Sequence, residues 1–166
     1  MSDMHLAQLN IGRLRAPIDS PEIAEFANAL DRVNALAEAS PGFVWRLQTD
    51  EGNATSVRPF PDEDVLVNLT VWTSVEALAD YVYRTDHTAF LRRRREWFHR
   101  MDTPIMVLWW LPASALPTVV DAVERLAHLT EHGPTPYAFT FRAPFAPDAT
   151  GIVAHATADE RDACPA

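Results

Sequence analysis

Residues 65–99, VLVNLTVWTSVEALADYVYRTDHTAFLRRRREWFH, decide the fold, because they read as a buried strand followed by a helix in two parts. Side chains alternate along a strand, so the odd-numbered positions from Val65 to Val71 share one face and the even-numbered positions share the other. Both faces are largely apolar, which predicts a central strand that is covered on both sides. Asn68 lies on the even-numbered face, where its side-chain amide needs hydrogen-bond partners.

The helical part begins directly after this strand. Thr73 and Glu76 fit a capping box, and Asp86-His87 marks a break or a restart in the helix. Helical spacing counted from His87 places four further side chains on one face, namely Phe90, Leu91, Arg94 and Phe98. One strand face and one helix face together predict a polar pocket with aromatic walls.

The remaining segments complete an α+β fold. Strands are predicted over residues 4–11, 43–48 and 105–111, and a helix begins at a Ser20 cap and ends at Ser40. The order β-α-β-β-α-β is that of the ferredoxin-like fold. A further helix from a Thr118 cap to His132 and a short strand over residues 137–142 are added to it. Residues 1–142 are predicted to form this domain, and residues 143–166 a disordered tail.

The strands are predicted to need a covering layer on each face. Two helices cover only one face of a four-stranded sheet, and an exposed apolar sheet face must be buried by something. A second copy is the simple way to cover the remaining face, so we expect a homodimer in which sheet faces or edges are joined. A polar connection over residues 49–64, with its Gly and Pro residues, has the length of a long hairpin loop or a lid.

Composition excludes several classes of protein. The net charge is −9 and the pI is about 5.0, which argues against nucleic acid as a partner. The four arginines at 92–95 point in nearly all directions on a helix, which favours solvated side chains over a phosphate site. Cys164 is the single cysteine, no CxxC spacing exists, and no segment resembles a signal peptide or a membrane span. We expect a cytoplasmic protein without membrane partners.

Several segments resemble one bacterial family, DUF3291, a domain of unknown function placed with the dimeric α/β-barrel proteins. These segments are LAQLNIGRL, SPGFVWRL, VNLTVWTSVEALADYVYRTDH, FLRRRREWF, LWWLP and AHLTEHGPTPYAFTFR. They extend from about Met4 to Arg142. The resemblance implies a dimeric α/β barrel and supplies no established reaction.

The wider superfamily implies two activities. It includes cofactor-free antibiotic-biosynthesis monooxygenases, in which an Asn and a Trp on one strand line the substrate pocket, and Asn68 and Trp72 look like that pair. It also includes haem-degrading monooxygenases with a helical His as iron ligand. His87 lies in a comparable region, although its spacing from Trp72 is longer than in that motif.

Each candidate residue has a functional and a structural interpretation. Asn68 holds an oxyanion or makes a structural hydrogen bond, and Trp72 stacks on a planar ligand or packs in the core. His87 is a general base, a haem ligand or a helix-end group. Arg94 binds a carboxylate or phenolate, or forms a surface ion pair. Further candidates for substrate contact are Trp45, Trp97, Phe98, Gln8 and Asn10, with core or dimer-interface packing as the alternative for the aromatic residues.

Three functions remain open from the sequence. The first is a cofactor-independent monooxygenase-like enzyme of secondary metabolism that acts on an aromatic or polyketide-like molecule. The second is a dimer that binds haem or another small molecule without catalysis, and the third is a structural domain. No metal site is expected, because His128 and His132 share a helix face but lack a third ligand.

Overall fold

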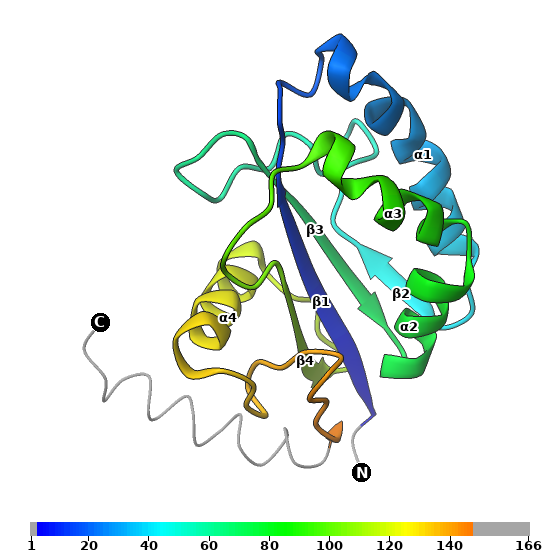
Figure 1. The fold of residues 1–166 in the computed structure, drawn as a ribbon. Coiled ribbons are helices and arrows are strands. Elements are labelled where there is room, and N and C mark those ends of the chain that lie inside the picture. The colour runs from blue at the N-terminus through cyan, green and yellow to red at the C-terminus, as the bar shows by residue number, and fades with distance from the viewer. Residues whose placement is uncertain (1–2, 148–166) are drawn as a thin grey trace.

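Four strands form one antiparallel sheet in the order β2-β3-β1-β4 in the computed structural model, which describes residues 3–147 (Figure 1). The strands are β1 (Met4–Arg13), β2 (Phe43–Arg46), β3 (Val65–Trp72) and β4 (Met106–Pro112). A 3-10 turn, η1 (Pro21–Ile23), leads into α1 (Ala24–Ala39), and the later helices are α2 (Val75–Arg84), α3 (His87–Trp97) and α4 (Val119–His132). This order confirms the α+β, ferredoxin-like fold, with α4 as the added helix.

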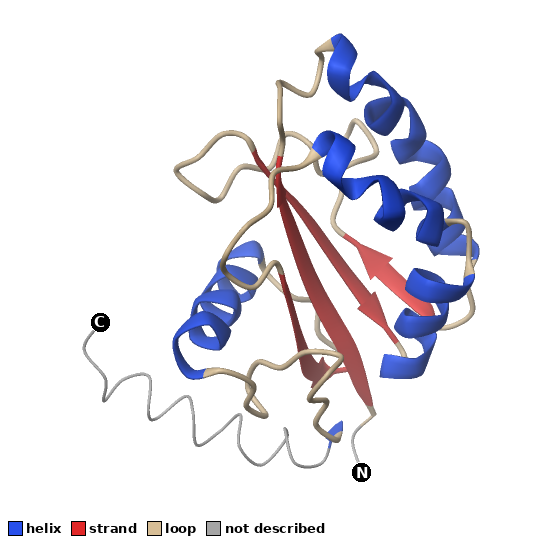
Figure 2. Ribbon diagram, viewed as in Figure 1, coloured by secondary structure: helices blue, strands red, loops and turns tan. Residues whose placement is uncertain are grey.

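The sheet is buried on both faces, as the sequence predicts for its central strand. Helices α1, α2 and α3 lie along one face, and α4 lies on the opposite face (Figure 2). Odd-numbered residues of the strands form a core with α4, in which Leu9, Leu69 and Val107 are at most 1% exposed. Each such side chain stabilises the fold by about 1.5–3 kcal/mol on leaving water. The even-numbered residues face α1, α2 and α3.

Helix α4 takes the place that the sequence analysis gives to a partner subunit. It begins as predicted at Thr118, whose Oγ1 accepts a hydrogen bond from the Asp121 amide at 3.1 Å. Leu126 and Leu129 pack into the sheet core, and Tyr137, beyond the helix, is buried with them. This face is therefore covered from within the chain. The apolar strand faces alone no longer require a dimer, and the homodimer stays a prediction.

A β-bulge in β2 decides which of its side chains face α1, α2 and α3. Phe43 pairs with Trp72, but the register shifts by one residue before Trp45. A bulge inserts one extra residue into one strand, and every later side chain then changes face. Trp45 consequently packs with the core on the α4 side, and Arg46 lies on the helix-covered face. Simple alternation along the strand predicts one face for Phe43, Trp45 and Leu47, but Phe43 lies on the face opposite to Trp45 and Leu47.

The predicted break in the helical segment is confirmed. Helix α2 ends at Arg84, and α3 begins at His87. Thr85, between them, uses its hydroxyl to donate to the Tyr81 carbonyl at 2.5 Å and to accept from the His87 amide at 3.2 Å. The break satisfies backbone groups at both helix ends and places His87 in the first turn of α3.

Two predicted helix caps differ in the structure. Ser74, not Thr73, caps α2, because the Ser74 Oγ accepts a hydrogen bond from the Ala77 amide at 3.1 Å. Ser20 makes no side-chain capping bond, since the chain first forms the 3-10 turn η1 and enters α1 only afterwards. In both cases the helical hydrogen-bond pattern begins later than the sequence signal suggests.

The predicted fifth strand over residues 137–142 is reduced to isolated bridges, in which Ala138 pairs with Thr135, Thr140 pairs with Ala143, and Phe139 alone pairs with β4. Phe139 exchanges backbone hydrogen bonds with Leu108 of β4, at 2.8 and 2.9 Å. The remaining residues of the segment form turns rather than a ladder.

Packing continues past the predicted domain boundary at residue 142. The Trp110 Nε1 donates to the Phe145 carbonyl at 2.7 Å, and the Phe145 ring lies 5.8 Å from the Phe139 ring. Residues 143–147 of the predicted tail thus belong to the packed domain. Residues 148–166 lie outside the described part of the chain.

Candidate functional site

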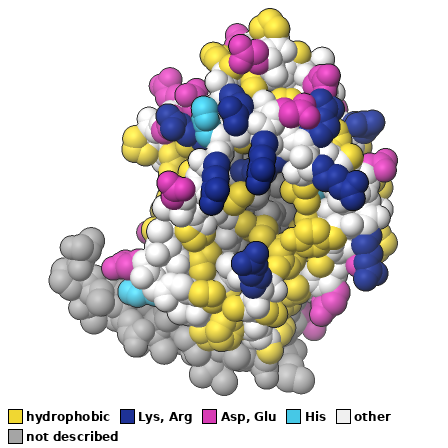
Figure 3. Space-filling model, in the orientation of Figure 1, with side chains coloured by type: hydrophobic (Ala, Val, Ile, Leu, Met, Phe, Trp, Pro, Cys, Tyr) yellow, Lys and Arg dark blue, Asp and Glu magenta, His cyan; other side chains and the backbone are white. Residues whose placement is uncertain are grey.

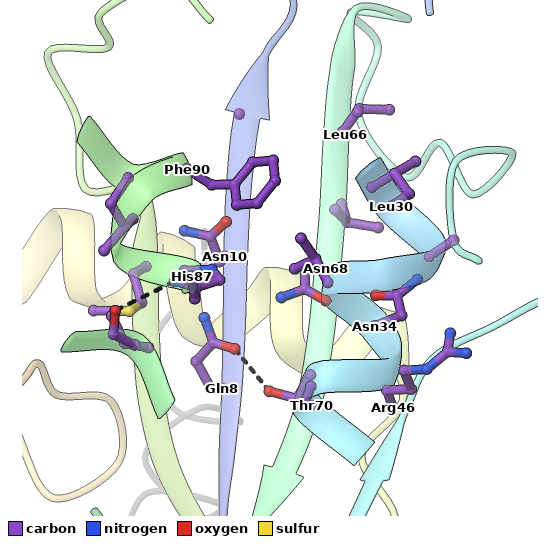
Figure 4. A pocket seen from close by; sticks show the side chains of 18 of the residues that line it. Gln8, Asn10, Leu30, Asn34, Arg46, Leu66, Asn68, Thr70, His87 and Phe90 are labelled. Carbon is purple, nitrogen blue, oxygen red and sulfur yellow. Dashed lines mark hydrogen bonds between the residues drawn. The ribbon is translucent and has the colours of Figure 1, made fainter. Parts of the chain in front are cut away.

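A cavity of about 350 Å³ lies between the even-numbered face of the sheet and the helices α1 and α3 (Figure 4). Its size falls within the range of small-molecule sites, about 300–1,000 Å³. Its wall is mostly apolar and includes the aromatic rings of Phe26, Phe90, Trp97 and Phe98. The polar residues that line it include Gln8 and Asn10 from β1, Asn34 from α1, Arg46 from β2, Asn68 and Thr70 from β3, and His87 and Arg94 from α3.

Two side-chain amides occupy opposing positions on neighbouring strands of the cavity floor. Asn10 is the direct antiparallel partner of Asn68, and both line the cavity. Asn68 is exposed although both its strand neighbours are buried, because its side chain opens onto the cavity. Within residues 3–147 neither amide has a protein hydrogen-bond partner. Each amide is therefore able to donate to and accept from a bound molecule.

Trp72 shares the strand face of Asn68 but lies beneath the cavity instead of lining it. It is fully buried, and its ring stacks on Tyr81 with the centroids 5.1 Å apart. The Trp72 Nε1 donates to the Thr70 Oγ1 at 2.9 Å, and the Thr70 hydroxyl donates to the Gln8 Oε1 at 2.8 Å. The predicted role of Trp72 as a substrate contact is thus replaced by a structural one. It holds Thr70 and Gln8 in position.

His87 lines the cavity from the first turn of α3. Its Nδ1 lies 3.4 Å from the Val82 carbonyl oxygen. A carbonyl oxygen only accepts, so this contact requires a proton on Nδ1 and leaves Nε2 of the neutral ring as an acceptor. Burial lowers the pKa of His87, and the Val82 contact partly opposes that effect. His87 is accordingly a neutral imidazole near pH 7 that is able to take up a proton.

Arg94 and Phe98 form a second polar and aromatic element of the wall. The Arg94 guanidinium lies over the Phe98 ring at 4.8 Å from its centroid, and its Nη2 donates to the Ile11 carbonyl at 2.9 Å. Gly12 provides the space for this arrangement, because a Cβ there would lie 2.6 Å from the Phe98 ring and 3.1 Å from the Arg94 Nη2. The missing side chain at Gly12 therefore lets α3 approach β1 closely.

The structure brings together most of the predicted site residues on one cavity. Those that line it are Gln8, Asn10, Asn68, His87, Arg94, Trp97 and Phe98. Trp45 does not, because the bulge in β2 turns it toward the core on the α4 side. The bulge brings Arg46 to the cavity in its place.

Thr70, Asn34 and Arg46 are among the polar lining residues that the sequence analysis does not name. Thr70 stands between two chosen positions on the same strand face, so alternation alone was sufficient to find it. Asn34 lies four residues after Leu30 on the apolar stripe of α1, which is a detectable signal of a polar group facing inward. Arg46 required knowledge of the bulge, which the sequence does not reveal.

Two further features of the described residues bear on function. Within residues 3–147, no group of three or more His, Cys, Asp or Glu side chains is placed to hold a metal ion. The His128 and His132 rings lie 4.5 Å apart, and the His128 Nε2 lies 3.3 Å from the Thr135 hydroxyl. No helix in this part of the chain is long and apolar enough to cross a membrane.

The fold and the cavity define a ferredoxin-like α+β protein with an internal pocket of small-molecule size. The chain belongs to the family described as Domain of unknown function (DUF3291), whose model matches residues 5–155. No curated protein matches the chain.

Solved structures with a similar arrangement include three proteins of low sequence identity. SnoaB, a cofactor-independent oxygenase from Streptomyces nogalater, is 17% identical with a TM-score of 0.44, covering 71% of this chain and 98% of that one. A Dabb family protein with a ferredoxin-like fold from Mesorhizobium loti is 17% identical with a TM-score of 0.42, covering 69% and 97%. A monooxygenase from Streptomyces coelicolor, in complex with Nanaomycin D, is 16% identical with a TM-score of 0.37, covering 70% and 94%.

Proposed function

We propose that the cavity binds a flat hydroxyaromatic, polyketide-like molecule and promotes its oxygenation by dioxygen without a resident cofactor. The observation that carries this proposal is that one apolar-walled cavity holds the neutral imidazole of His87 and two side-chain amides, Asn10 and Asn68, which have no hydrogen-bond partner among residues 3–147. The apolar walls favour an aromatic body, and the amides favour oxygen substituents at its edge. The imidazole, which burial keeps neutral, supplies a base.

The chemistry assigned to the protein is deprotonation, orientation and stabilisation of negative charge. The His87 Nε2 takes the proton of an aromatic hydroxyl, which makes the ring electron-rich. The amide N–H groups of Asn68 and Asn10 donate to the resulting phenolate oxygen. Such groups are effective because they are held in place before the reaction and need no reorganisation.

Dioxygen is the co-reactant that accepts the electrons. The phenolate transfers electrons to dioxygen, and a C–O bond forms at a ring carbon to give a hydroperoxide. The hydroperoxide loses water as its O–O bond breaks, and that carbon becomes a carbonyl. One oxygen atom of dioxygen remains in the quinone and the other leaves in water, so that phenol and dioxygen give quinone and water. The proton taken by His87 returns to the peroxide oxygen.

Oxygen consumption by the full-length chain tests this function. A hydroxynaphthalene or an anthrone is mixed with the protein in aerated buffer, and uptake is compared with the rate of uncatalysed oxidation in buffer alone. We expect faster uptake, a quinone product and one labelled oxygen atom per product from isotopically labelled dioxygen. His87→Ala should return the rate to the uncatalysed level, whereas His99→Gln, at an exposed residue outside the cavity, should not change it.

Two results would contradict the proposal. Uptake no faster than in buffer, together with saturable binding of the aromatic molecule, would indicate a binding protein without catalysis. A Soret band on titration with haem, at one haem per chain, would instead support the haem-binding alternative.

A further inference from the structure

The cavity has a charge opposite to that of the chain as a whole. The sequence holds 23 acidic residues against 14 cationic ones, all arginines, for a net charge of −9. No Asp or Glu is among the described residues that line the cavity, whereas Arg46 and Arg94 both line it. On the face drawn in Figure 3, cationic side chains gather around a hollow, and most acidic side chains lie farther out. Such a site attracts negative charge within an acidic protein.

The two arginines differ in their partners. Arg46 is neutralised, because its Nε lies 2.7 Å from the Glu38 Oε1, and its Nη1 donates to the Gly52 carbonyl at 2.8 Å. In residues 3–147 the Arg94 guanidinium has no carboxylate within ion-pair distance, and it makes one hydrogen bond, to the Ile11 carbonyl. A guanidinium has several N–H donors, so most of those on Arg94 are open to a ligand.

The Arg94 side chain is also partly removed from water. It is half-buried between the cavity and the Phe98 ring, and burial lowers its pKa. A cation removed from water without a counterion is costly, so a partner anion is a favourable addition. The fit around Gly12, which leaves no room for a Cβ, keeps the guanidinium in this place.

We propose that the ligand of this cavity carries a carboxylate, which Arg94 binds, on a fused-ring aromatic body. The proposal rests on the cavity being the ligand site, as proposed above, and adds the class of ligand. A planar guanidinium binds both oxygens of a carboxylate in a fork, which a lysine ammonium does not.

The helix sets the distance between the two ends of the ligand. His87 and Arg94 are seven residues apart on α3, which is about 10 Å at roughly 1.5 Å per residue. The carboxylate therefore lies at the opposite end from the hydroxyl that His87 deprotonates. That separation fits two or three fused rings better than a single ring.

Equilibrium binding of two matched probes to the full-length chain tests the inference. The probes are anthraquinone-2-carboxylate and anthraquinone-2-carboxamide, which are similar in shape, differ in charge and are already oxidised, so no turnover is needed. We expect the carboxylate to bind about tenfold or more tightly than the carboxamide, since hydrogen bonds between two charged groups are stronger than those to a neutral group. Calorimetry gives both dissociation constants.

The ratio of the two dissociation constants is then compared among variants. In Arg94→Gln the ratio should fall to about one, and in Arg94→Lys it should fall only in part, because the charge remains but the fork is lost. Arg92→Gln changes an exposed arginine of the same helix that does not line the cavity, and it should keep the full ratio. The ratio is used because partial unfolding of a variant weakens the apparent binding of both probes by the same factor. If Arg94→Gln does not fold, the comparison of Arg94→Lys with the unaltered chain decides.

An unaltered chain that binds neither probe, or binds both equally, overturns the inference, as does an Arg94 variant that keeps the full ratio. If the protein speeds oxygen uptake by a neutral hydroxyaromatic but does not prefer the carboxylate probe, the proposed oxygenation is supported and only the carboxylate inference is overturned. If the unaltered chain prefers the carboxylate, Arg94→Gln loses that preference and no oxygen uptake is seen, the carboxylate inference is supported and the proposed oxygenation is overturned.

Discussion

Asn10 and Asn68 stand directly opposite each other on β1 and β3, yet neither side-chain amide has a hydrogen-bond partner within the described residues. Polar groups in the interior of a sheet are normally paired, because an unpaired one is costly. Here both amides line the cavity, and Asn68 is exposed to it, so neither needs a partner within the protein. The two central strands thus keep polar groups that packing does not use, which is the expected signature of a binding site.

Asn68→Ala should reduce function far more than stability. It removes no protein hydrogen bond, so the free energy of unfolding should change by less than about 0.5 kcal/mol. If the amide stabilises an oxyanion, kcat/KM for oxygen uptake should fall by about 10²-fold or more. Asn28→Ala, at an exposed position of α1 outside the cavity, is the matched control. A loss of stability with full activity would instead assign Asn68 a structural role.

Thr70→Val should destabilise the protein through two residues at once. The substitution keeps the shape but removes the hydroxyl that accepts from Trp72 and donates to Gln8. Leaving buried polar groups unpaired costs about 1–3 kcal/mol. Urea unfolding measures this loss. Thr55→Val is the control, because the Thr55 hydroxyl that it removes bonds only to the nearby Asn53 in the same loop. An unchanged unfolding midpoint would show that water replaces the missing hydroxyl.

The pKa of His87 makes stability and activity depend on pH in the same direction. Burial lowers that pKa in the folded state below the unfolded value of about 6.5. The unfolded chain therefore takes up the proton first as pH falls, so this contribution to stability is present above about pH 6.5 and is lost toward the folded pKa. Activity that needs the neutral ring should persist below pH 6.5 and then decline.

Unfolding free energies at several pH values between 5 and 8 check this dependence. In His87→Gln the unfolding free energy should depend less steeply on pH, and in His99→Gln this dependence should be unchanged. The NMR titration of the His87 ring should give a pKa below about 6.5. A titration above that value would remove His87 as a neutral base at pH 7.

Truncation after Arg142 should lower the melting temperature. It removes the Phe145 carbonyl that accepts from the Trp110 Nε1, and it uncovers part of Phe139, which is fully buried. An unpaired indole N–H alone costs about 1–3 kcal/mol. Truncation after Pro147 keeps the Phe145 contacts, so comparing the two truncated chains isolates the effect of residues 143–147. Equal melting temperatures would restore the boundary predicted from the sequence.

Gly12→Ala should destabilise the protein and weaken the site together. The added Cβ would meet the Phe98 ring at 2.6 Å and the Arg94 Nη2 at 3.1 Å, so the ring has to move. Overpacking of this kind costs about 1–3 kcal/mol. Thermal unfolding measures the first effect, and the carboxylate-to-carboxamide ratio measures the second. A ratio that survives a shifted Phe98 would show that Arg94 does not depend on this support.

Periodicity was sufficient to predict the helix side of the site. His87, Phe90 and Arg94 repeat at helical spacing, and a helix that packs on a sheet turns one such face inward. The strand side was predicted in part, because alternation gives the face of a residue but not its depth. Asn68 and Trp72 share a face, yet one opens onto the cavity and the other lies under Tyr81.

Features that depend on pairing between distant segments were beyond the sequence. The bulge in β2 depends on the register of this strand with β3, and no local residue pattern predicts the bulge. The position of α4 on the second sheet face depends on how a C-terminal helix packs, so a second subunit was the simpler expectation.

The bulge between Phe43 and Trp45 also has an evolutionary consequence. Without the one-residue slip, the side chain of Trp45 would take the place of Arg46 at the cavity, and an indole would replace a guanidinium. A single insertion or deletion in this short strand therefore exchanges the chemistry of one wall without substituting any amino acid. The side chain at this place in the cavity wall is thus set by the register between β2 and β3 as well as by the residue types.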